Sequence, residues 1–552
     1  MTNSQSPAKG VKLQRELGLF SAINLIVSVM IGSGIFVSPS SALKYAGSVY
    51  ASLCIWAACG FLSLLGALAY AELGTVVGKS GAEYAFYQAA FTPLHKFWGP
   101  LPSFINAWIS VLFVRPAEVA VIILTFSEYF VTMIMNIYEY FASATIDAAL
   151  KPHLIKLVAL LALGVITFIN FMSVKLYVKI QNLFSSLKVF ASMVIVVGGL
   201  YYLFQGKTEH LEKGFEGSTL TPNNIVIAIF NGLWAYDGWS SVTVVAEEIK
   251  RPGVNIPRSI LIGVPLVTGL YVFMNLSYMS VLSIDEMKGS AAVAVLFSEK
   301  VLGPFQFIVP LGVVLATFGC ALSVQFGITR LCYAAGREGH MLQAFSFVHV
   351  KRLTPAPAVL LQGFLTCFCI LAGNIYSLLE FASFLCWIFY GMAMAALILL
   401  RYTKPDVPRP YKVPLVIPIF VLILSIVLFI TPIVYDPKPQ FLNAIVFIGL
   451  GILVYIPFVY YKYRMPYLEN ITYLIQVLLK VVPPEETDQD SLGDTESRGT
   501  AASPSKHSMH KLTNGSAENS TLLQTQSNGG VTIVPASESV YHVVVKTPSP
   551  RF

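Results

Sequence analysis

The chain has 552 residues, of which 55% are hydrophobic and only 12% are charged. Because soluble domains carry roughly 25% charged residues, this composition excludes a soluble globular protein and predicts a polytopic membrane protein. The formal net charge of +7 falls largely on loops between apolar segments, where it indicates membrane orientation and not binding to nucleic acid.

Twelve apolar segments follow one another along the chain, and runs of about 20 apolar residues are typical of transmembrane helices. Their expected limits are 18–44, 48–76, 98–135, 155–173, 179–204, 223–247, 257–283, 305–336, 356–373, 376–401, 414–434 and 441–463. We therefore predict an all-α polytopic membrane protein with twelve transmembrane helices. Lys and Arg concentrate in the N-terminus and the even-numbered loops, which predicts that both termini are cytoplasmic.

Glycine and serine interrupt the first segment, in the stretch IGSGIF (31–36). Gly32, Ser33 and Gly34 weaken a helix there, and lipid tolerates irregular backbone only where it lines a cavity or is buried in protein. One interpretation is a ligand-binding break, because glycine lets a ligand approach the backbone closely. The alternative is close packing of helices through small residues.

The sixth segment is interrupted in a similar way, by Gly232, Asp237 and Gly238 within 229–248. The two breaks are five helices apart, so the two halves of the chain have opposite orientations, which is typical of a 5+5 inverted repeat with its binding site between the breaks. The N–H end of a broken helix attracts a carboxylate and the C=O end attracts an ammonium. A zwitterionic α-amino acid is therefore the predicted ligand.

The chain carries several long motifs in a fixed order: IGSGIFVSP, GALAYAELGTVVGKSGAEY (66–84), NGLWAYDGW, AEEIKRPGVNIPRSI (246–260), and ITRLCYAAGREGHMLQAFSFVH with LTPAPA (328–358). These motifs resemble the L-type amino-acid transporters, the light subunits of heteromeric transporters in the amino acid–polyamine–organocation superfamily. The resemblance runs from about residue 16 to 465. It implies a LeuT-like fold with broken helices 1 and 6, a plasma-membrane location and sodium-independent transport.

The resemblance also implies how the first break binds its substrate. Gly32, Ser33 and Gly34 would present N–H groups to the substrate carboxylate, and the carbonyls of Met30 and Ile31 would lie nearby. The motifs therefore assign the glycines of the opening stretch to a carboxylate site.

At the second break, the resemblance implies that the carbonyls of Trp234, Ala235 and Asp237 receive the substrate amine, with the Trp234 ring as a gate. Ser240 stands where many family members have asparagine. Asp237 has two interpretations that the sequence leaves open. It faces the side chain of a cationic substrate, since an intramembrane aspartate is usually functional, or it caps the second half-helix.

Lys188, in the fifth segment, resembles a family lysine that stands where sodium binds in related transporters. This resemblance implies transport without sodium. The alternative is a lysine whose side chain snorkels to the cytoplasmic membrane surface.

The chain departs from the family in the outer loop at about 136–154, which contains no cysteine. Light subunits usually carry a cysteine there that forms a disulfide with a heavy subunit, so we expect no disulfide-linked heavy subunit. All seven cysteines fall in apolar segments, where small buried side chains are the simplest interpretation. The sequence predicts no metal site.

Composition divides the chain into a cytoplasmic N-terminus (1–17), a transporter domain (18–465) and a cytoplasmic tail (466–552) that is mostly disordered. The hydrophobic end of the tail, Pro550, Arg551 and Phe552, is compatible with strand addition to a PDZ domain. The alternative is a tail with no partner.

Together these features predict a sodium-independent transporter, with exchange as the expected mode, for neutral L-amino acids and, on the first interpretation of Asp237, for cationic ones. Its expected partners are the amino-acid substrate and the lipid bilayer. The sequence contains no activated nucleophile or phosphate-binding loop, so we predict no enzymatic activity and no cofactor. An amino-acid sensor or scaffold that binds with little or no turnover is the alternative.

Overall fold

The structure is a computed structural model that describes residues 17–483, apart from 79–80, 143–148, 245, 247–248, 291, 353, 374, 436, 438 and 464–465. Two compact units separate at residue 486, and the described residues all belong to the first. The C-terminal motif proposed for PDZ binding lies outside the described residues.

Nine helical spans in the described part of the chain are long and apolar enough to cross a membrane. They are formed by α3 (Val49–Val77), α5 (Leu101–Ile109) continued by η1 (Ser110–Val114) and α6 (Arg115–Ala142), α7 (Lys151–Met172), α8 (Val174–Phe204), α12 (Pro252–Val281), α15 (Ile308–Arg337), α17 (Ile375–Thr403), α18 (Val416–Tyr435), and α19 (Pro439–Tyr455) continued by η5 (Ile456–Tyr460). The prediction of an all-α polytopic membrane protein is confirmed.

Helices also occupy the three remaining predicted segments. The first segment holds α1 (Leu19–Met30) and α2 (Gly34–Ala46), which bend by 51° and count as a tenth span when taken together. The sixth holds α10 (Pro222–Tyr236) and the short α11 (Ser241–Val244), and the ninth holds α16 (Ala356–Ala372). These last two segments are too short to count as spans by length, so the count of twelve stays a prediction.

Short elements connect the spans or follow the last one. They are α4 (Glu83–Phe91), α9 (Glu209–Glu212), α13 (Ile284–Gly289), α14 (Val293–Leu302), η3 (Gly303–Phe305), η4 (Gln343–Ser346), β1 (Val348–His349), α20 (Pro466–Leu479) and β2 (Val481–Val482). The two strands pair antiparallel, with Val348 opposite Val482. The helix α20 and the strand β2 are ordered elements at the start of the segment assigned to the tail. The domain boundaries stay a prediction.

Local sequence explains where the helices begin and end. Ser48 and Thr221 are the N-caps of α3 and α10, and their hydroxyls accept the N–H groups of Ala51 and Asn224 at 3.4 and 3.3 Å. Gly47 ends α2 with a φ of 81°, a left-handed conformation that favours glycine.

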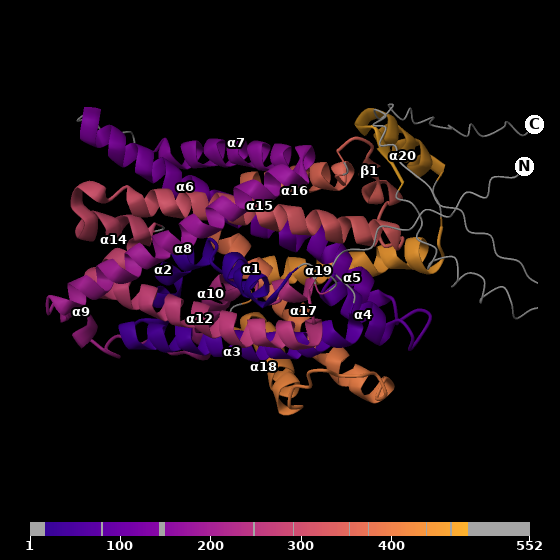
Figure 1. The fold of residues 1–552 in the computed structure, drawn as a ribbon, viewed down its shortest axis with the longest axis horizontal. Coiled ribbons are helices and arrows are strands. Elements are labelled where there is room, and N and C mark those ends of the chain that lie inside the picture. Colours follow the sequence, from indigo (N-terminus) through magenta and orange to yellow (C-terminus); the bar gives the residue numbers. More distant parts are fainter. Residues whose placement is uncertain are drawn as a thin grey trace, which may run out of the picture. The chain divides into compact units, whose positions relative to one another are not determined.

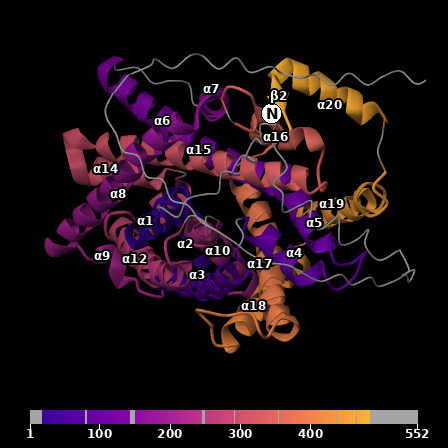
Figure 2. The same ribbon diagram turned by 45° about the vertical axis from the view of Figure 1, so that its right-hand side comes forward.

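The two broken segments lie in the interior of the helical bundle. In Figures 1 and 2, α1, α2 and α10 run between α8 and α15 on one side and α3 and α12 on the other. The interhelical contacts agree, since α10 packs against α2 and α3, and α1 packs against α12. Peripheral helices instead expose apolar side chains, such as Leu161, Phe364 and Ile423, as a lipid-facing surface requires.

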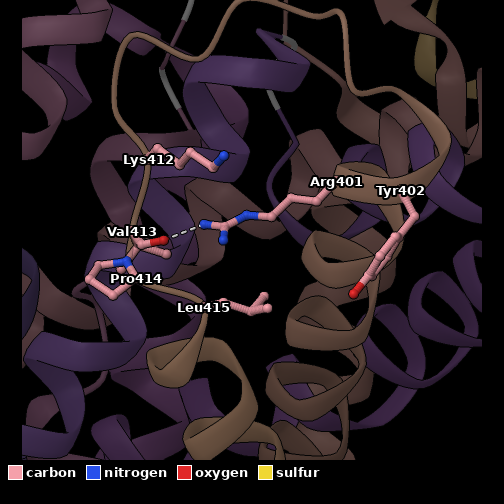
Figure 3. A pocket seen from close by; sticks show the side chains of 6 residues that line it. All are labelled: Arg401, Tyr402, Lys412, Val413, Pro414 and Leu415. Atoms are coloured by element: carbon pink, nitrogen blue, oxygen red, sulfur yellow. Dashed lines mark hydrogen bonds between the residues drawn. The ribbon is translucent and has the colours of Figure 1, made fainter.

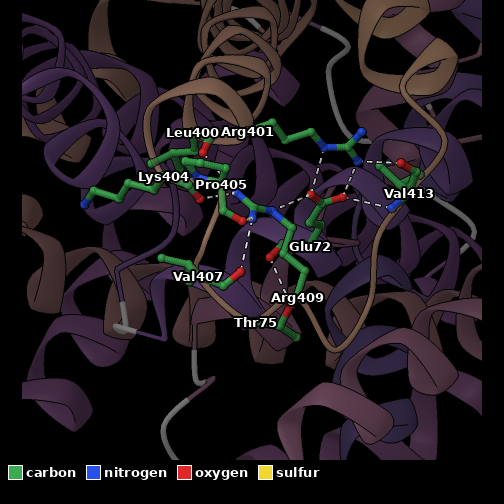
Figure 4. Close-up of polar contacts among 9 residues, drawn as sticks. All are labelled: Glu72, Thr75, Leu400, Arg401, Lys404, Pro405, Val407, Arg409 and Val413. Atoms are coloured by element: carbon green, nitrogen blue, oxygen red, sulfur yellow. Dashed lines mark hydrogen bonds and ion pairs between the residues drawn. The ribbon is translucent and has the colours of Figure 1, made fainter.

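A buried ion-pair cluster, formed by Glu72, Arg401 and Arg409, joins α3 to the end of α17 and to the connection that follows (Figure 4). The fully buried Glu72 carboxylate accepts hydrogen bonds from Arg401 Nε at 2.9 Å and from the Val413 N–H at 2.8 Å. Arg409 Nε lies 3.5 Å from Glu72 Oε1. Arg409 also donates to the backbone carbonyls of Leu400, Lys404, Pro405 and Val407. We call this group the Glu72 cluster.

Candidate functional site

The first break begins after Met30 and extends to Ser33. The Ile31 N–H donates to Val27 O at 3.0 Å and the Gly32 N–H to Met30 O at 2.8 Å, so the chain tightens as α1 ends. The helix α2 then begins at Gly34. The N–H groups of a first helical turn have no partner within the helix and carry partial positive charge. The start of α2 is therefore suited to an anionic group.

The second break follows Tyr236, the last residue of α10. Asp237 is extended, with φ −60° and ψ 145°, and Gly238 has a φ of 107° that disfavours any side chain. The Asp237 N–H donates to Trp234 O at 3.2 Å, and Ser240 O accepts the N–H of Thr243 at 2.9 Å. The last carbonyl oxygens of α10 have no N–H partner further along the same helix, so they are available at the second break.

The two breaks meet at Gly34 and Ala235. A Cβ atom placed on Gly34 would overlap Ala235 Cα and would lie 2.9 Å from Ala235 Cβ. A Cβ on Gly32 would lie 2.8 Å from the Sγ of Cys320 in α15. Close helix packing, the alternative weighed for these glycines, therefore acts at Gly34. It brings the amino end of α2 and the carboxyl end of α10 together, as the ligand-binding interpretation also requires.

Tyr271, in α12, links the two breaks and was not predicted from the sequence. Its fully buried hydroxyl lies within hydrogen-bond distance of Met30 O at 2.5 Å and of Ala235 O at 3.0 Å. Two of the carbonyls that the motifs assign to substrate binding are therefore partly satisfied by one tyrosine. No local pattern distinguishes this residue from the other 26 of the 27 tyrosines in the chain.

Lys188 contacts α1 shortly before the first break. It is fully buried in α8, and its Nζ donates a hydrogen bond to the carbonyl oxygen of Ser28 in α1. A lysine that snorkels to the membrane surface would keep its amine exposed, so the observed position favours the interpretation of Lys188 as a tethered cation beside α1.

The Asp237 carboxylate contacts α17. Its Oδ1 accepts a hydrogen bond from the hydroxyl of Tyr390 in α17 at 2.6 Å. The residue directly before α11 is Ser240 and not Asp237. Asp237 instead ends α10 as its C-cap. This placement favours the interpretation of Asp237 as a side-chain contact over that of an N-cap.

Further charged groups surround Asp237. Arg115 Nη1 donates to Glu118 Oε2 at 2.8 Å, as residues three apart on one helix face can do. Both groups interact electrostatically with Asp237, as does Glu83. One arginine therefore lies near three carboxyl groups, and its hydrogen bond goes to Glu118 and not to Asp237. An ionised Asp237 would attract a cationic side chain here.

A small cavity of about 10 Å³ lies beside this charged region. Its lining includes Glu83, Arg115 and Tyr390. The buried Trp239 packs against two tyrosines of this region, since its ring centre lies 5.0 Å from that of Tyr390 and 4.7 Å from that of Tyr70. The partly buried Trp234 lies two residues before Tyr236 on α10. Aromatic rings and charged groups thus occur together at the second break.

Comparison with known proteins places these features in a family. A family model described as amino acid permease matches residues 17–473. The chain is 42% identical to the human b(0,+)-type amino acid transporter 1 over 487 residues, which cover 88% of this chain and 96% of that one. It is 37% identical to the human cystine/glutamate transporter over 489 residues, with coverage of 88% and 94%. It is 36% identical to the human large neutral amino acids transporter small subunit 2 over 484 residues, with coverage of 86% and 87%.

Proposed function

Because the chain belongs to the amino acid permease family, we propose that it is a sodium-independent exchanger of neutral and cationic L-amino acids. Permeases move solutes across membranes, so the chain is a transporter and not an enzyme. The same membership favours turnover over the alternative of a sensor that only binds. The observation that carries the proposal is the contact of two helix breaks, at Gly34 and Ala235, in the interior of the bundle.

In this proposal the substrate binds where the breaks meet. The N–H groups of Ser33 and Gly34 face the substrate carboxylate, and opposite partial charges favour that arrangement. The Gly32 N–H donates to Met30 O in the structure, and in this proposal it turns to the carboxylate when the substrate binds. The substrate amine binds carbonyl oxygens at the ends of α1 and α10. Ile31 and Asp237 are the strongest candidates, because Met30 and Ala235 already face the Tyr271 hydroxyl. Trp234 covers the substrate, and Ser240 lies at the edge of the site.

Asp237 supports the extension to cationic substrates. Its carboxylate accepts a hydrogen bond from Tyr390 and carries a negative charge, while the nearby Arg115 is paired with Glu118. A guanidinium or ammonium from the substrate would balance that charge, whereas a neutral side chain would leave it unchanged. Arginine and leucine are therefore the two substrates whose comparison is most informative.

Lys188 supports transport without sodium. Its ammonium already occupies the position beside the Ser28 carbonyl, so a fixed positive charge is present where a sodium ion would otherwise be needed to satisfy the oxygens of the broken helix. We propose that this charge keeps α1 in place through every transport cycle.

The remaining parts of the proposal concern the whole protein. The multi-pass chain resides in the plasma membrane with both termini in the cytoplasm, which the distribution of Lys and Arg supports. It functions without a disulfide-linked heavy subunit, since its outer loops contain no cysteine. Pro550, Arg551 and Phe552 are proposed to bind a PDZ-domain protein.

Purified full-length protein in sodium-free liposomes tests the function. Liposomes preloaded with leucine should take up labelled leucine and arginine faster than empty liposomes, because an exchanger needs a substrate on both sides. Equal uptake with and without internal amino acid would contradict exchange. Binding of leucine without any uptake would support the sensor instead.

A further inference from the structure

A second cavity lies outside the helix breaks, between the end of α17 and the start of α18. It has a volume of about 540 Å³ and is lined by Arg401, Tyr402, Lys412, Val413, Pro414 and Leu415 (Figure 3). The transport site described above uses none of these residues. The cavity combines cationic side chains with an aromatic ring and aliphatic groups, which is a lining suited to an amphipathic anion.

The Glu72 cluster fixes the guanidinium of Arg401 in the wall of this cavity. Arg401 Nε and Nη2 donate to the two oxygens of Glu72 at 2.9 and 2.5 Å, and Nη2 also donates to the carbonyl of Val413. Nη1 takes part in none of these bonds. An arginine held in this way is already oriented, so an anion that binds it loses little additional side-chain entropy.

The surroundings carry more positive than negative charge. The buried Glu72 carboxylate faces two arginines, Arg401 and Arg409, and therefore neutralises only one of them. The exposed Lys412 adds a further cation, and Figure 3 shows its amine near the guanidinium of Arg401. The net positive charge favours an anion with several acceptor oxygens, such as a phosphate group.

The other side of the cavity opens onto apolar surface. Tyr402 is 73% exposed and Leu415 is 37% exposed, and α18 continues from there with the exposed side chains of Val416 and Phe420. In a membrane-spanning helix, such residues face lipid chains, and tyrosine is enriched at the level of the head groups. A ligand that contacts both the cationic side and the apolar side of the cavity needs a phosphate next to a hydrocarbon chain.

We propose that this cavity binds the head group of an anionic phospholipid. Arg401 and Lys412 contact the phosphate, while Tyr402 and Leu415 contact the first part of an acyl chain. The proposal rests on the proposed orientation, in which this end of α17 faces the cytoplasm, because anionic lipids concentrate in the cytoplasmic leaflet. A soluble phosphate would satisfy the cations but would leave the apolar wall uncovered.

Lipid binding to the purified full chain in detergent tests the proposal, with short-chain phosphatidylserine and phosphatidylcholine as probes. The wild-type protein should bind phosphatidylserine in preference to phosphatidylcholine. Lys412→Gln should weaken phosphatidylserine binding about fivefold, the effect of one cationic residue near an anionic lipid surface. Lys404→Gln is the matched control, because Lys404 is exposed on the same connection but does not line the cavity, and it should bind as the wild type does.

Three results would overturn the proposal: equal binding of the two lipids, equal effects of the two lysine variants, or displacement of phosphatidylserine by inorganic phosphate at an equal concentration. The last result would identify a site for soluble phosphate. Arg401 is left unchanged, because its loss would leave the buried Glu72 without its main partner. Leucine exchange in liposomes of neutral lipid is measured in parallel. Exchange without preferential lipid binding would contradict the lipid site alone and would leave the transport proposal intact.

Discussion

At the residue scale, Asp237 is the group that decides which side chains the site accepts. Asp237→Asn removes the negative charge and preserves the shape of the side chain. Arginine uptake should fall at least about tenfold, since a hydrogen bond to a charged group contributes about 1.5–3 kcal/mol. Leucine uptake should stay near the wild-type rate. The measurement is initial uptake of both labelled amino acids into the same liposomes.

Tyr390→Phe is the control for this variant. It removes the hydroxyl that donates to Asp237 Oδ1 but keeps the carboxylate charge, so the preference for arginine should persist. If Asp237→Asn lowers arginine and leucine uptake equally, Asp237 has a structural role and does not contact the substrate side chain.

Residues differ in how far the sequence reveals them. Gly32, Gly34 and Gly238 could be predicted because glycine and polar residues inside an apolar segment are conspicuous. Tyr271 could not, because a tyrosine in a transmembrane segment is ordinary and its importance depends on two carbonyls far away in the sequence, Met30 O and Ala235 O. The packing of α12 against α1 and of α10 against α2 brings them together.

At the scale of elements, the contact between α2 and α10 holds the site together. Gly34→Ala would place a methyl group against Ala235, and overpacking of this kind costs about 1–3 kcal/mol of stability. We therefore expect a lower melting temperature and a loss of leucine uptake, both measured on purified protein.

Gly269→Ala, in α12, is the matched control because no atom lies within 4 Å of the added Cβ position. It should melt at or above the wild-type temperature, since alanine favours helix over glycine. Wild-type stability and uptake in Gly34→Ala would show that α2 and α10 do not pack this closely in the membrane.

The elements also differ in how well the sequence predicts them. The long spans could be predicted because about 20 apolar residues leave few alternatives. The strands β1 and β2 are each two residues long, and no periodic pattern can identify so short a strand. They form because η4, α16 and α20 lie next to one another, which is a tertiary and not a local property.

At the scale of the whole molecule, the absence of an outer-loop cysteine makes a prediction about assembly. The seven cysteines are free thiols in the structure. The chain extracted from membranes with blocked thiols should therefore migrate identically on gels with and without reductant. A band of higher mass that disappears on reduction would reveal a covalent partner and contradict this part of the proposal.

The central claim is that an amino acid binds between the two breaks, on backbone N–H groups. The most direct measurement is equilibrium binding of labelled leucine to purified Ser33→Ala and Ser33→Leu, each checked for a monodisperse elution profile. Ser33→Ala should bind as the wild type does, because it keeps the backbone N–H and removes only the hydroxyl. Ser33→Leu should lose binding, because its side chain fills the carboxylate site. Wild-type binding by a well-folded Ser33→Leu protein would place the amino acid elsewhere and contradict the account.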